Sequence, residues 1–530
     1  DVRSAALGIA FLALSRSFVD YSTSGLENPL THLLLAVFLA LYVRGDESPR
    51  AMRWMAAIAA LALMTRPDTL LLVAPPLAAA LWRHRDARSL FSVGQGLIPL
   101  LLWSAFALLY FGSPIPNTAI SKLDADVPGL WMQGLRYLQI SAEADPLLPL
   151  GLVAGPALAL VLRVPRSGAV AAGIALDLLY TVSIGGDFMA GRFLTDSLFC
   201  GVALLTCLPP WAPHRIATAA AAIPLLAAIP VLRSHFGDGG PWHAFQEQPH
   251  RPLPRYGISD ERRWYRHQLG LIAHWRSGRP APAPAASETT DTTEDAATER
   301  TVAVEGTAGV QAYKWGPAVH VVDLHALTDP LLARLPAMSV DWRPGHARRV
   351  VPPGYIETLR TGEMHLEDER LARLYETLDS VHRGALFDPA RLRAIAELLL
   401  FGSGDFVDAD YYRKPPRLSF KASELRDAAP RSFLMPGVVV RWDRPGHPRN
   451  LRASLSEQHD FMVTFVLARQ PLATIPAKAT GPGGRGLAER EIEVPDVVRR
   501  RGFDAVVIAS DTWYSDQQFR IGGVSRSNTR

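Results

Sequence analysis

The sequence contains little cysteine, no dense block of basic residues and no phosphate-binding loop. Its 530 residues include two cysteines, Cys200 and Cys207, within one apolar run. Seven residues of helix separate them by about 10 Å, which is beyond the reach of a disulfide. The formal net charge of +4 comes from scattered arginines, so no nucleic-acid partner is expected. Glycines over 302–316 lack the Gly-Lys-Ser/Thr of a phosphate loop, and no His/Cys spacing predicts a metal site.

The sequence also lacks an initiating methionine and a signal-peptide pattern. It begins at Asp1 and passes directly into residues 4–17, which are already apolar enough for a membrane. We therefore expect a chain whose natural N-terminus has been lost.

Long apolar runs are what the sequence does have, and they are confined to its first half. Hydrophobic residues make up 48% of the chain, yet residues 234–530 have the composition of an ordinary polar protein. Several runs are short for a hydrocarbon core of roughly 30 Å, so tilted or partial helices are expected. The sequence predicts a polytopic α-helical membrane domain over 1–233, with apolar segments at about 4–18, 29–43, 52–64, 69–82, 90–111, 147–162, 168–184, 193–210 and 216–232.

The second half divides by composition into a linking region and a soluble domain. Residues 234–301 begin with an aromatic, basic stretch, expected to lie against the membrane surface, and end in a Pro-, Thr- and acid-rich flexible linker. Residues 302–530 are expected to form an extracytoplasmic domain that is mixed α/β over 302–425 and β-rich, like a β-sandwich, over 426–530. No nucleophile and base stand out there, so we expect a binding or bracing role.

The connections between the apolar segments fall alternately into two sets that differ in their charged residues. Those at 65–68, 113–126 and 185–193 hold carboxylates together with arginine or lysine, and the one at 22–29 holds Glu27. As a group they are rich in Gly, Pro and Asn. Solvated interfacial loops are the simpler interpretation, but four such loops on one face favour a polar site. The other set, which the positive-inside rule places in the cytoplasm, carries Arg44, Arg50, Arg53, Arg83, Arg85, Arg88, Arg163, Arg166 and Arg215. An odd number of crossings then also places residues 234–530 outside.

Three ionisable residues lie in the first two of these outer loops. Glu27 opens an apolar run, where a carboxylate either binds a ligand or only caps the helix. Arg66 and Asp68 flank Pro67, which interrupts a helix and frees backbone groups that need polar neighbours. Arg66 either holds a phosphate in bidentate fashion or forms an internal ion pair with Asp68.

Four more candidates lie in the other two outer loops. Asn117 and Lys122 follow the fifth apolar segment, and Lys122 is the only lysine before the soluble half. An ammonium suits a phosphate as a point charge, although a lone lysine is often only solvated. In GGDFMAGRF (185–193), Asp187 is placed to bind sugar hydroxyls and Arg192 to bind the phosphate of a lipid-linked sugar, with an internal ion pair as the alternative.

Several motifs, taken together and in order, resemble a known family. They are SGLENPL (24–30), LMTRPDTLLL (63–72), SPIPNTAISK (113–122), GGDFMAGRF (185–193), and in the second half HVVDLHALTDPLLARLPA (320–337) and WRPGHARRVVPPGY (342–355). The set is similar to polytopic glycosyltransferases of the GT-C superfamily, in the branch of the mycobacterial terminal β-(1→2) arabinofuranosyltransferases. The resemblance implies a GT-C-like membrane domain.

The resemblance also implies a reaction. The donor would be a polyprenyl-phosphate sugar, with arabinofuranose as the best candidate, and the acceptor would be cell-wall arabinan or a related envelope polysaccharide outside the cytoplasmic membrane. A carboxylate would deprotonate the acceptor hydroxyl while a cation stabilises the leaving phosphate. Membrane lipids are a further partner that the resemblance implies. It implies no cofactor with certainty, and it leaves open whether the reaction requires a divalent metal.

The resemblance extends to the site residues, with one departure. An acidic pair in a pattern like Asp-Asp-Ala-Tyr-Ile is absent, so the catalytic base is expected upstream of Asp1, with Asp187 or Glu27 as substitutes. Ala190 replaces the proline of the family's GGD motif. By resemblance, the donor cavity is lined by Glu27, Arg66, Asp68, Asn117, Lys122, Asp187 and Arg192.

Two further interpretations stay open at this point. The first is a membrane-anchored glycan-binding or assembly protein that has the same fold without the activity. The second is a transporter, which the long outer domain and the absence of evident inverted repeats disfavour.

Overall fold

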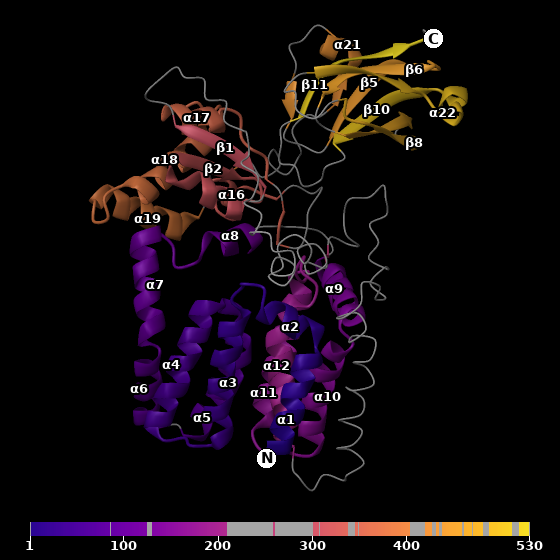
Figure 1. Ribbon diagram of the computed structural model, residues 1–530. Helices are drawn as coiled ribbons and strands as arrows, with labels where there is room; N and C mark the ends of the chain where they lie inside the picture. Colours follow the sequence, from indigo (N-terminus) through magenta and orange to yellow (C-terminus); the bar gives the residue numbers. More distant parts are fainter. Residues whose placement is uncertain are drawn as a thin grey trace, which may run out of the picture.

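The structure is a computed structural model of the 530-residue chain. Its described residues form a helical half (2–208), an α/β unit (300–402) and a β-sandwich (419–528). In Figure 1 the helical half is at the bottom, with the α/β unit at the upper left and the β-sandwich at the upper right. The apolar segment predicted at 216–232 and nearly all of 234–301 lie outside the described residues. The described residues are 2–84, 86–123, 130–208, 258–259, 300–306, 308–337, 345–347, 349–402, 407, 419–426, 431–433, 437–457, 460–468, 470–480, 487–510 and 519–528.

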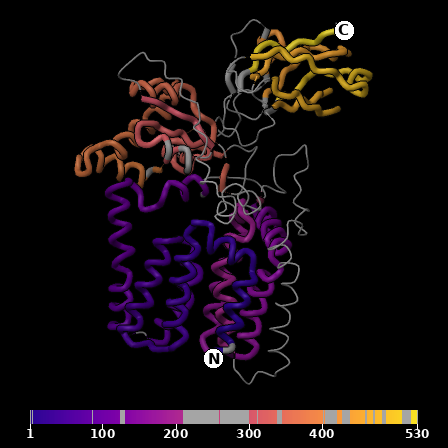
Figure 2. The backbone as a smooth tube through the Cα atoms, in the orientation of Figure 1, coloured from indigo at the N-terminus to yellow at the C-terminus, as the bar shows by residue number. Residues whose placement is uncertain are grey.

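The helical half is a set of helices that stand side by side with their ends at two levels (Figure 2). Each apolar segment predicted within the described residues is helical, which confirms this part of the prediction. Two short 3-10 helices, η1 (Pro67–Thr69) and η2 (Arg192–Leu194), lie between longer ones. The α-helices are α1 (Val2–Leu14), α2 (Arg16–Ser22), α3 (Asn28–Arg44), α4 (Pro49–Thr65), α5 (Leu70–Arg83), α6 (Ala87–Gly96), α7 (Ile98–Phe111), α8 (Asn117–Leu123), α9 (Leu130–Ala144), α10 (Leu147–Val161), α11 (Ser167–Ser183) and α12 (Thr195–Thr206).

The structure differs from the predicted segments in four places. One is helix α8 (Asn117–Leu123), which lies within the connection predicted at 113–126. The run at 4–18 is divided at Ser15, whose side chain caps α2. The run at 90–111 is divided at Leu97, just before the proline in the first turn of α7. Helix α9 was not predicted because polar residues such as Gln133 interrupt its hydrophobic pattern, yet one of its faces is buried around Tyr137.

The arginine-bearing connections meet at one end of the helical half. The Glu47 carboxylate lies 2.6 Å from Arg83 Nη2, 2.6 Å from His84 Nε2 and 3.2 Å from Arg166 Nη2. These residues come from three different connections, so the alternate sorting of charge corresponds to two physical ends of the structure. Which end faces the cytoplasm stays a prediction.

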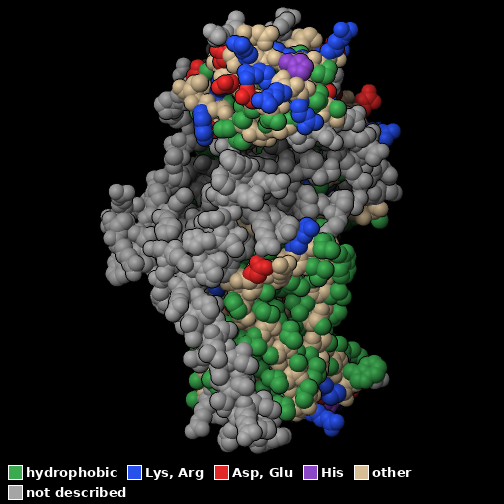
Figure 3. Space-filling model, turned by 90° about the vertical axis from the view of Figure 1, so that its right-hand side faces the viewer, with side chains coloured by type: hydrophobic (Ala, Val, Ile, Leu, Met, Phe, Trp, Pro, Cys, Tyr) green, Lys and Arg blue, Asp and Glu red, His purple; other side chains and the backbone are tan. Residues whose placement is uncertain are grey.

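The sides of the helical half expose many hydrophobic residues. Figure 3 shows hydrophobic side chains over much of the visible face of this half. Among the described residues, no single helix combines the length and the hydropathy that a membrane crossing requires. Two pairs meet both requirements together, although each is bent: α6 with α7 by 46° and α9 with α10 by 105°. On α7, the exposed large hydrophobic side chains are Ile98, Leu101, Leu102, Trp103, Phe106, Tyr110 and Phe111.

The α/β unit is built on two parallel strands, β1 (Thr301–Glu305) and β2 (Val319–Asp323). Parallel strands need a crossover connection, which α16 (Ala308–Trp315) and η5 (Gly316–Ala318) provide. Buried residues including Val322, Leu332 and Leu374 join the strands and the following helices in one core. These helices are η6 (Leu332–Arg334), α17 (Tyr355–Thr361), α18 (Glu369–Arg383) and α19 (Pro389–Phe401).

Two buried arginines fix the α/β unit on the end of the helical half. Arg349 donates to two carbonyl oxygens of its own unit and to Ser121 O of α8, at 2.5 Å. Arg391 donates in the same way within its unit and to Tyr110 O of α7, at 2.9 Å. Because both arginines are buried, water cannot easily replace these hydrogen bonds, and the junction has a defined geometry.

The β-sandwich consists of two sheets with strand orders β3-β5-β10-β7-β8 and β4-β11-β6-β9. Both contribute to one core, for example through Phe465 and Phe503 from the first sheet and Leu455 and Ile521 from the second. Strand β3 pairs with β5, so the sandwich includes residues ahead of the predicted division at 425. Its elements are β3 (Ser419–Lys421), α21 (Ala422–Arg426), β4 (Arg431–Phe433), β5 (Gly437–Gly446), β6 (Asn450–Ser456), β7 (Phe461–Leu467), β8 (Gln470–Ala477), β9 (Leu487–Glu493), α22 (Asp496–Arg501), β10 (Phe503–Ser510) and β11 (Phe519–Ser527).

Candidate functional site

The end of the helical half that faces the α/β unit carries a cluster of charged side chains centred on Arg66. Arg66 follows α4 and is only 6% exposed. It forms a bidentate ion pair with Asp68, whose Oδ1 accepts from Arg66 Nε at 3.1 Å. Arg66 Nη1 lies 3.4 Å from Asp196 Oδ2 and 3.7 Å from Glu27 Oε1. Arg66 is therefore surrounded by carboxylates, which fits the internal ion pair considered from the sequence.

Arg192 is the second cation of the cluster and shares one carboxylate with Arg66. Its Nη2 donates to Glu27 Oε1 at 2.8 Å, and its Nη1 donates to Asp187 Oδ2 at 3.4 Å. Both guanidinium groups lie over the ring of Phe193, at 5.1 Å for Arg66 and 5.7 Å for Arg192. Three of the four loops singled out in the sequence thus contribute two cations and three carboxylates to one place.

The loop that holds Asp187 has a fixed shape. Gly186 has φ +74°, and a Cβ there would collide with the Tyr137 ring, so both conformation and space require glycine. The Tyr137 hydroxyl donates to Met189 O and accepts from Phe193 N, both at 3.1 Å. Asp187 itself is 1% exposed and accepts from the backbone N–H of Phe188 at 2.9 Å. Its carboxylate therefore has one ion pair and one backbone hydrogen bond.

A short piece of the linking region packs on the same loop. Ser259 N donates to Phe188 O at 2.6 Å, and Ala190 N donates to Ser259 O at 3.1 Å. Ile258 is fully buried in the core around Tyr137. The described part of 234–301 therefore contributes to the wall of the site.

Lys122 differs from the two arginines because it is exposed. Its ammonium is close enough to Asp187, Arg192, Arg66 and Glu27 for their charges to act on it. Within the described part of the chain it makes no hydrogen bond or ion pair, and it lies next to Gly345 of the α/β unit. It is thus an exposed cation near the charged cluster.

Asn117 is placed away from the charges, at the junction with the α/β unit. Its side-chain amide donates to the carbonyl oxygens of Ala326, Leu327 and Asp329, at 3.2, 3.2 and 3.1 Å. This arrangement holds two parts of the chain together, and it leaves the amide no spare donor for a ligand. The resemblance grouped Asn117 with the donor cavity, and the structure gives it a contact of a different kind.

Several site residues were missed by the sequence reasoning. Asp196 contacts Arg66, and its Oδ1 lies 3.1 Å from His32 Nε2. The only signal for either residue was an ionisable side chain inside an apolar run, at His32 in 29–43 and at Asp196 in 193–210. From the α/β unit, the His346 ring lies against Phe188, the residue after Asp187, and the His325 ring lies 5.4 Å from that of His346. Neither histidine carried a distinguishing signal in the sequence.

No group of three or more His, Cys, Asp or Glu side chains suited to a metal ion occurs within the residues that the structure describes. The cations of the cluster are therefore arginine and lysine side chains. An anion such as a phosphate is the ligand that these side chains favour.

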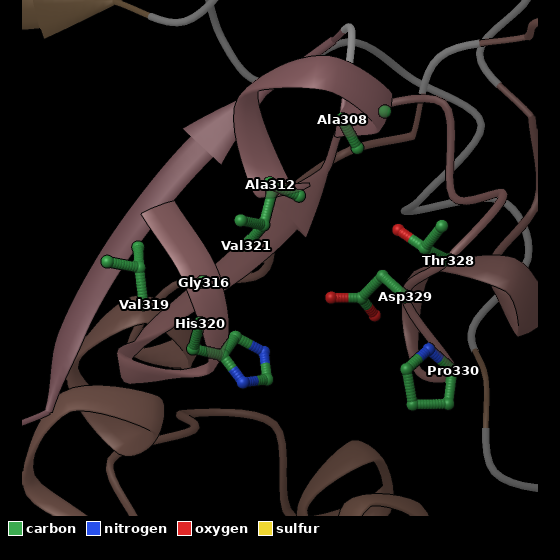
Figure 4. A pocket seen from close by; sticks show the side chains of 10 residues that line it. Ala308, Ala312, Gly316, Val319, His320, Val321, Thr328, Asp329 and Pro330 are labelled. Atoms are coloured by element: carbon green, nitrogen blue, oxygen red, sulfur yellow. The ribbon is translucent and has the colours of Figure 1, made fainter. Parts of the chain in front are cut away.

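A separate groove of about 340 Å³ lies on the α/β unit, and Figure 4 shows its lining residues. His320 and Asp329 point into it, and none of the charged cluster described above lines it. Burial raises the pKa of Asp329 to about 6, although the backbone N–H groups of Leu332 and Leu331 and the Tyr355 hydroxyl hydrogen-bond to its carboxylate.

Comparison with known proteins gives one distant relative. Over 229 residues the chain is 28% identical to the terminal β-(1→2)-arabinofuranosyltransferase of Mycobacterium tuberculosis, a match that covers 36% of this chain and 35% of that protein. The chain thus spans about a third of the length of this relative. No protein-family model and no solved structure matches it. The match supports a related glycosyltransferase.

Proposed function

We propose that this chain is a membrane glycosyltransferase that moves a sugar from a polyprenyl-phosphate donor to a cell-envelope polysaccharide on the outer face of the cytoplasmic membrane. Arabinofuranose is the proposed sugar because the relative is an arabinofuranosyltransferase. The observation that carries the proposal is a pair of cations near the buried Asp187, at one end of an apolar helical body. Arg192 Nη1 lies 3.4 Å from Asp187 Oδ2, and Lys122 is near enough for its charge and that of Asp187 to interact.

The membrane part of the proposal has its own support. The sides of the helical half expose large hydrophobic side chains, and a surface of this kind on a protein is normally covered by lipid or by a partner. The charged groups gather at its two ends, where a membrane protein meets water. We place the cluster around Arg192 at the outer end because the opposite end holds the arginine-bearing connections.

The proposed reaction is a displacement at the anomeric carbon of the donor. The acceptor oxygen forms the new glycosidic bond, the bond from the anomeric carbon to the phosphate oxygen breaks, and polyprenyl phosphate leaves. Phosphate is a good leaving group, so stabilising its negative charge matters more than protonating it. In our assignment Lys122 and Arg192 supply this stabilisation, and Asp187 and Glu27 accept hydrogen bonds from sugar hydroxyls.

Arg66 has a different role in this assignment. It has Asp68, Asp196 and Glu27 around it and is almost completely buried, so a phosphate would have to displace an existing carboxylate. We therefore assign Arg66 and Asp68 to holding the shape of the cluster and Asn117 to holding the α/β unit over it.

Transfer by the purified full-length protein tests the proposal. The assay uses a radiolabelled polyprenyl-phosphate arabinofuranose and a synthetic arabinofuranoside acceptor, and NMR of the product identifies the linkage. Lys122→Gln should lower kcat/KM about 10- to 100-fold, as expected for one lost charge-assisted phosphate contact. Lys421→Gln, which removes an exposed lysine on the β-sandwich, is the matched control and should leave the rate unchanged.

One result would favour the competing interpretation. If the protein binds arabinan oligosaccharides but transfers no sugar from this donor, it is a glycan-binding protein with the fold and without the activity. If Lys122→Gln and the wild type transfer sugar at the same rate, the proposed enzymatic activity stands. The assignment of Lys122 to the phosphate site is then refuted.

A further inference from the structure

Exposed arginines gather at the end of the helical half that lies away from the charged cluster. They come from the end of α3, the first two turns of α4, the first turn of α6 and the turn after α10, which Figure 1 shows at the lower end of this half. Figure 3 shows Lys and Arg side chains at the same end, below a face of hydrophobic side chains. We define the arginine face as those arginines whose exposed side chains make no hydrogen bond or ion pair within the described part of the chain: Arg44, Arg50, Arg53, Arg88 and Arg163.

The carboxylates of the same connections are held by other groups. Glu47 binds three cations from the neighbouring connections, as described above. Asp46 accepts from the backbone N–H of Ser48 at 3.0 Å, and Asp86 accepts from that of Ser89 at 2.7 Å, where it caps α6. The arginine face therefore carries positive charge that no carboxylate among the described residues binds.

The turn between α10 and α11 holds one of these arginines in a conformation that favours glycine. Arg163 has φ +52° and Arg166 has φ +66°, in the left-handed region that strains residues with a Cβ. Arg166 makes a contact that needs its side chain, the ion pair with Glu47 at 3.2 Å. The side chain of Arg163 makes no such contact with the described residues, so an arginine at this strained position points to a ligand outside the chain.

Helix α6 indicates what surrounds this end of the protein. Its polar residues Ser89 and Ser92 are buried, whereas its large hydrophobic residues Leu90 and Phe91 are exposed. A helix on the surface of a soluble protein has the opposite arrangement. Acyl chains are the surroundings that suit this face of α6, and Arg88 lies in the first turn of the same helix.

Two tryptophans indicate where the acyl chains end. Trp54 follows Arg53 and Trp82 precedes Arg83, and both side chains are exposed. Tryptophan is enriched where acyl chains meet headgroups, because its ring is largely apolar and its N–H is polar. The arginine face thus lies at the level of the lipid phosphates.

We propose that the arginine face binds the headgroups of anionic phospholipids. A guanidinium donates two parallel hydrogen bonds to a phosphate group, and each arginine near an anionic leaflet adds to the attraction. In a zwitterionic headgroup the choline cation offsets the phosphate, so the arginines favour an anionic lipid such as phosphatidylglycerol. This inference uses the membrane placement of the proposed function and none of its chemistry.

Binding of phosphatidylglycerol to the purified full-length protein in detergent micelles tests the inference. A fluorescent phosphatidylglycerol is titrated, and energy transfer from tryptophan gives its apparent Kd. The combined variant Arg44→Gln, Arg53→Gln and Arg163→Gln should bind this lipid about 100-fold more weakly, because three charges near the headgroups are lost. Its unfolding temperature in lipid-free detergent should stay unchanged, since these exposed side chains have no partner in the described part of the protein.

Three comparisons separate the headgroup from other causes of weaker binding. The same three positions changed to lysine keep the charge and should retain most of the affinity. A matched control, Arg370→Gln with Arg373→Gln and Arg393→Gln, removes exposed arginines of α18 and α19 and should bind the lipid like the wild type. The wild type should bind a fluorescent phosphatidylcholine at least about tenfold more weakly than phosphatidylglycerol, and added salt should weaken the binding of phosphatidylglycerol.

Three results would overturn the inference: equal affinity of the wild type for the two lipids, a glutamine variant within about threefold of the wild type, or displacement of phosphatidylglycerol by millimolar inorganic phosphate, which would make the arginine face a site for the free ion. If the glutamine variant does not fold, the comparison of the two lipids on the wild type decides. A wild type that selects phosphatidylglycerol and transfers no sugar refutes the proposed enzymatic activity and supports this inference. One that transfers sugar and binds both lipids equally refutes only the inference.

Discussion

Replacing Arg192 by alanine should nearly abolish sugar transfer. Arg192 is the second cation of the cluster, 2.8 Å from Glu27 Oε1 and 3.4 Å from Asp187 Oδ2, with its side chain 16% exposed. A guanidinium that stabilises the leaving phosphate lowers the barrier by about 2–5 kcal/mol, which is about 30- to 4000-fold in rate. Arg192→Lys keeps the charge without the fork of donors and should fall between alanine and wild type.

The same substitution also affects stability, and the structure indicates which carboxylate is responsible. The Asp187 carboxylate is 2% exposed, and removing the partner of such a buried charge costs about 3–5 kcal/mol of folding free energy. Glu27 is 27% exposed and stays 3.7 Å from Arg66. Removing its partner Arg192 therefore costs less folding free energy than it does for Asp187. Arg192→Ala combined with Asp187→Asn should therefore recover most of the lost stability.

Donor binding, transfer rate and unfolding temperature are measured for the wild type, both single variants and the double variant. A double variant that folds as well as the wild type and remains inactive supports the phosphate role of Arg192. One that folds and transfers sugar at the wild-type rate would show that Arg192 only neutralises Asp187, and the reasoning would be refuted.

Three further predictions concern the junction, the orientation and the α/β unit. Arg349→Leu leaves the carbonyl oxygen of Ser121 and two others without a donor, at about 1–3 kcal/mol each, so the unfolding temperature of the full protein should fall clearly; an unchanged value would mean that the junction contributes no stability. In a cysteine-free background of intact cells, an impermeant maleimide should label Ser113→Cys and spare Asp86→Cys, and the reverse would invert the proposed orientation. Burial raises the pKa of Asp329 from 3.8 to about 6, so its contribution to stability is complete below pH 3.8 and is lost as the pH rises through 6. The free energy of unfolding of the wild type should therefore fall by up to about 3 kcal/mol relative to Asp329→Asn between pH 4 and 7, and parallel curves would contradict the shift.

The helices were largely predictable because hydrophobic runs of this length rarely adopt a secondary structure other than a helix. The sequence reasoning located the apolar helical segments of residues 4–208 but missed α8 and α9. In α9, residues such as Gln133 and Arg136 interrupt the hydrophobic run, and burial of Tyr137 and Ile140 on one face stabilises the helix instead. It also missed the break at Ser15, since a cap depends on a side-chain hydrogen bond that hydropathy does not register. The strands of the β-sandwich were recognisable from their alternation, as in Phe461–Leu467, where alternate residues are buried.

The site was predictable only in part, because the sequence does not show which charged side chains pair in three dimensions. Motifs at the helix ends correctly indicated that Glu27, Arg66, Asp187 and Arg192 lie together, because alternate connections share one end of a helical body. They did not indicate which carboxylate binds which guanidinium, and they gave no reason to separate Asn117 from the charges. The imidazole of His346 could not be placed at all, since its position depends on how the α/β unit is fixed by Arg349.

The pairing pattern gives the two arginines different relations to a bound phosphate. Arg66 has a bidentate partner in Asp68 and a second carboxylate in Asp196, so its charge is already neutralised by residues that cannot move far. Arg192 donates its shorter hydrogen bond to Glu27, the most exposed carboxylate of the cluster, whose Oε1 also lies 3.7 Å from Arg66 Nη1. A donor phosphate that displaces Glu27 from Arg192 leaves this carboxylate beside Arg66, so its negative charge keeps a partner throughout. Under the proposed function, Glu27 thus lets Arg192 bind a phosphate without leaving an unpaired charge in the cluster.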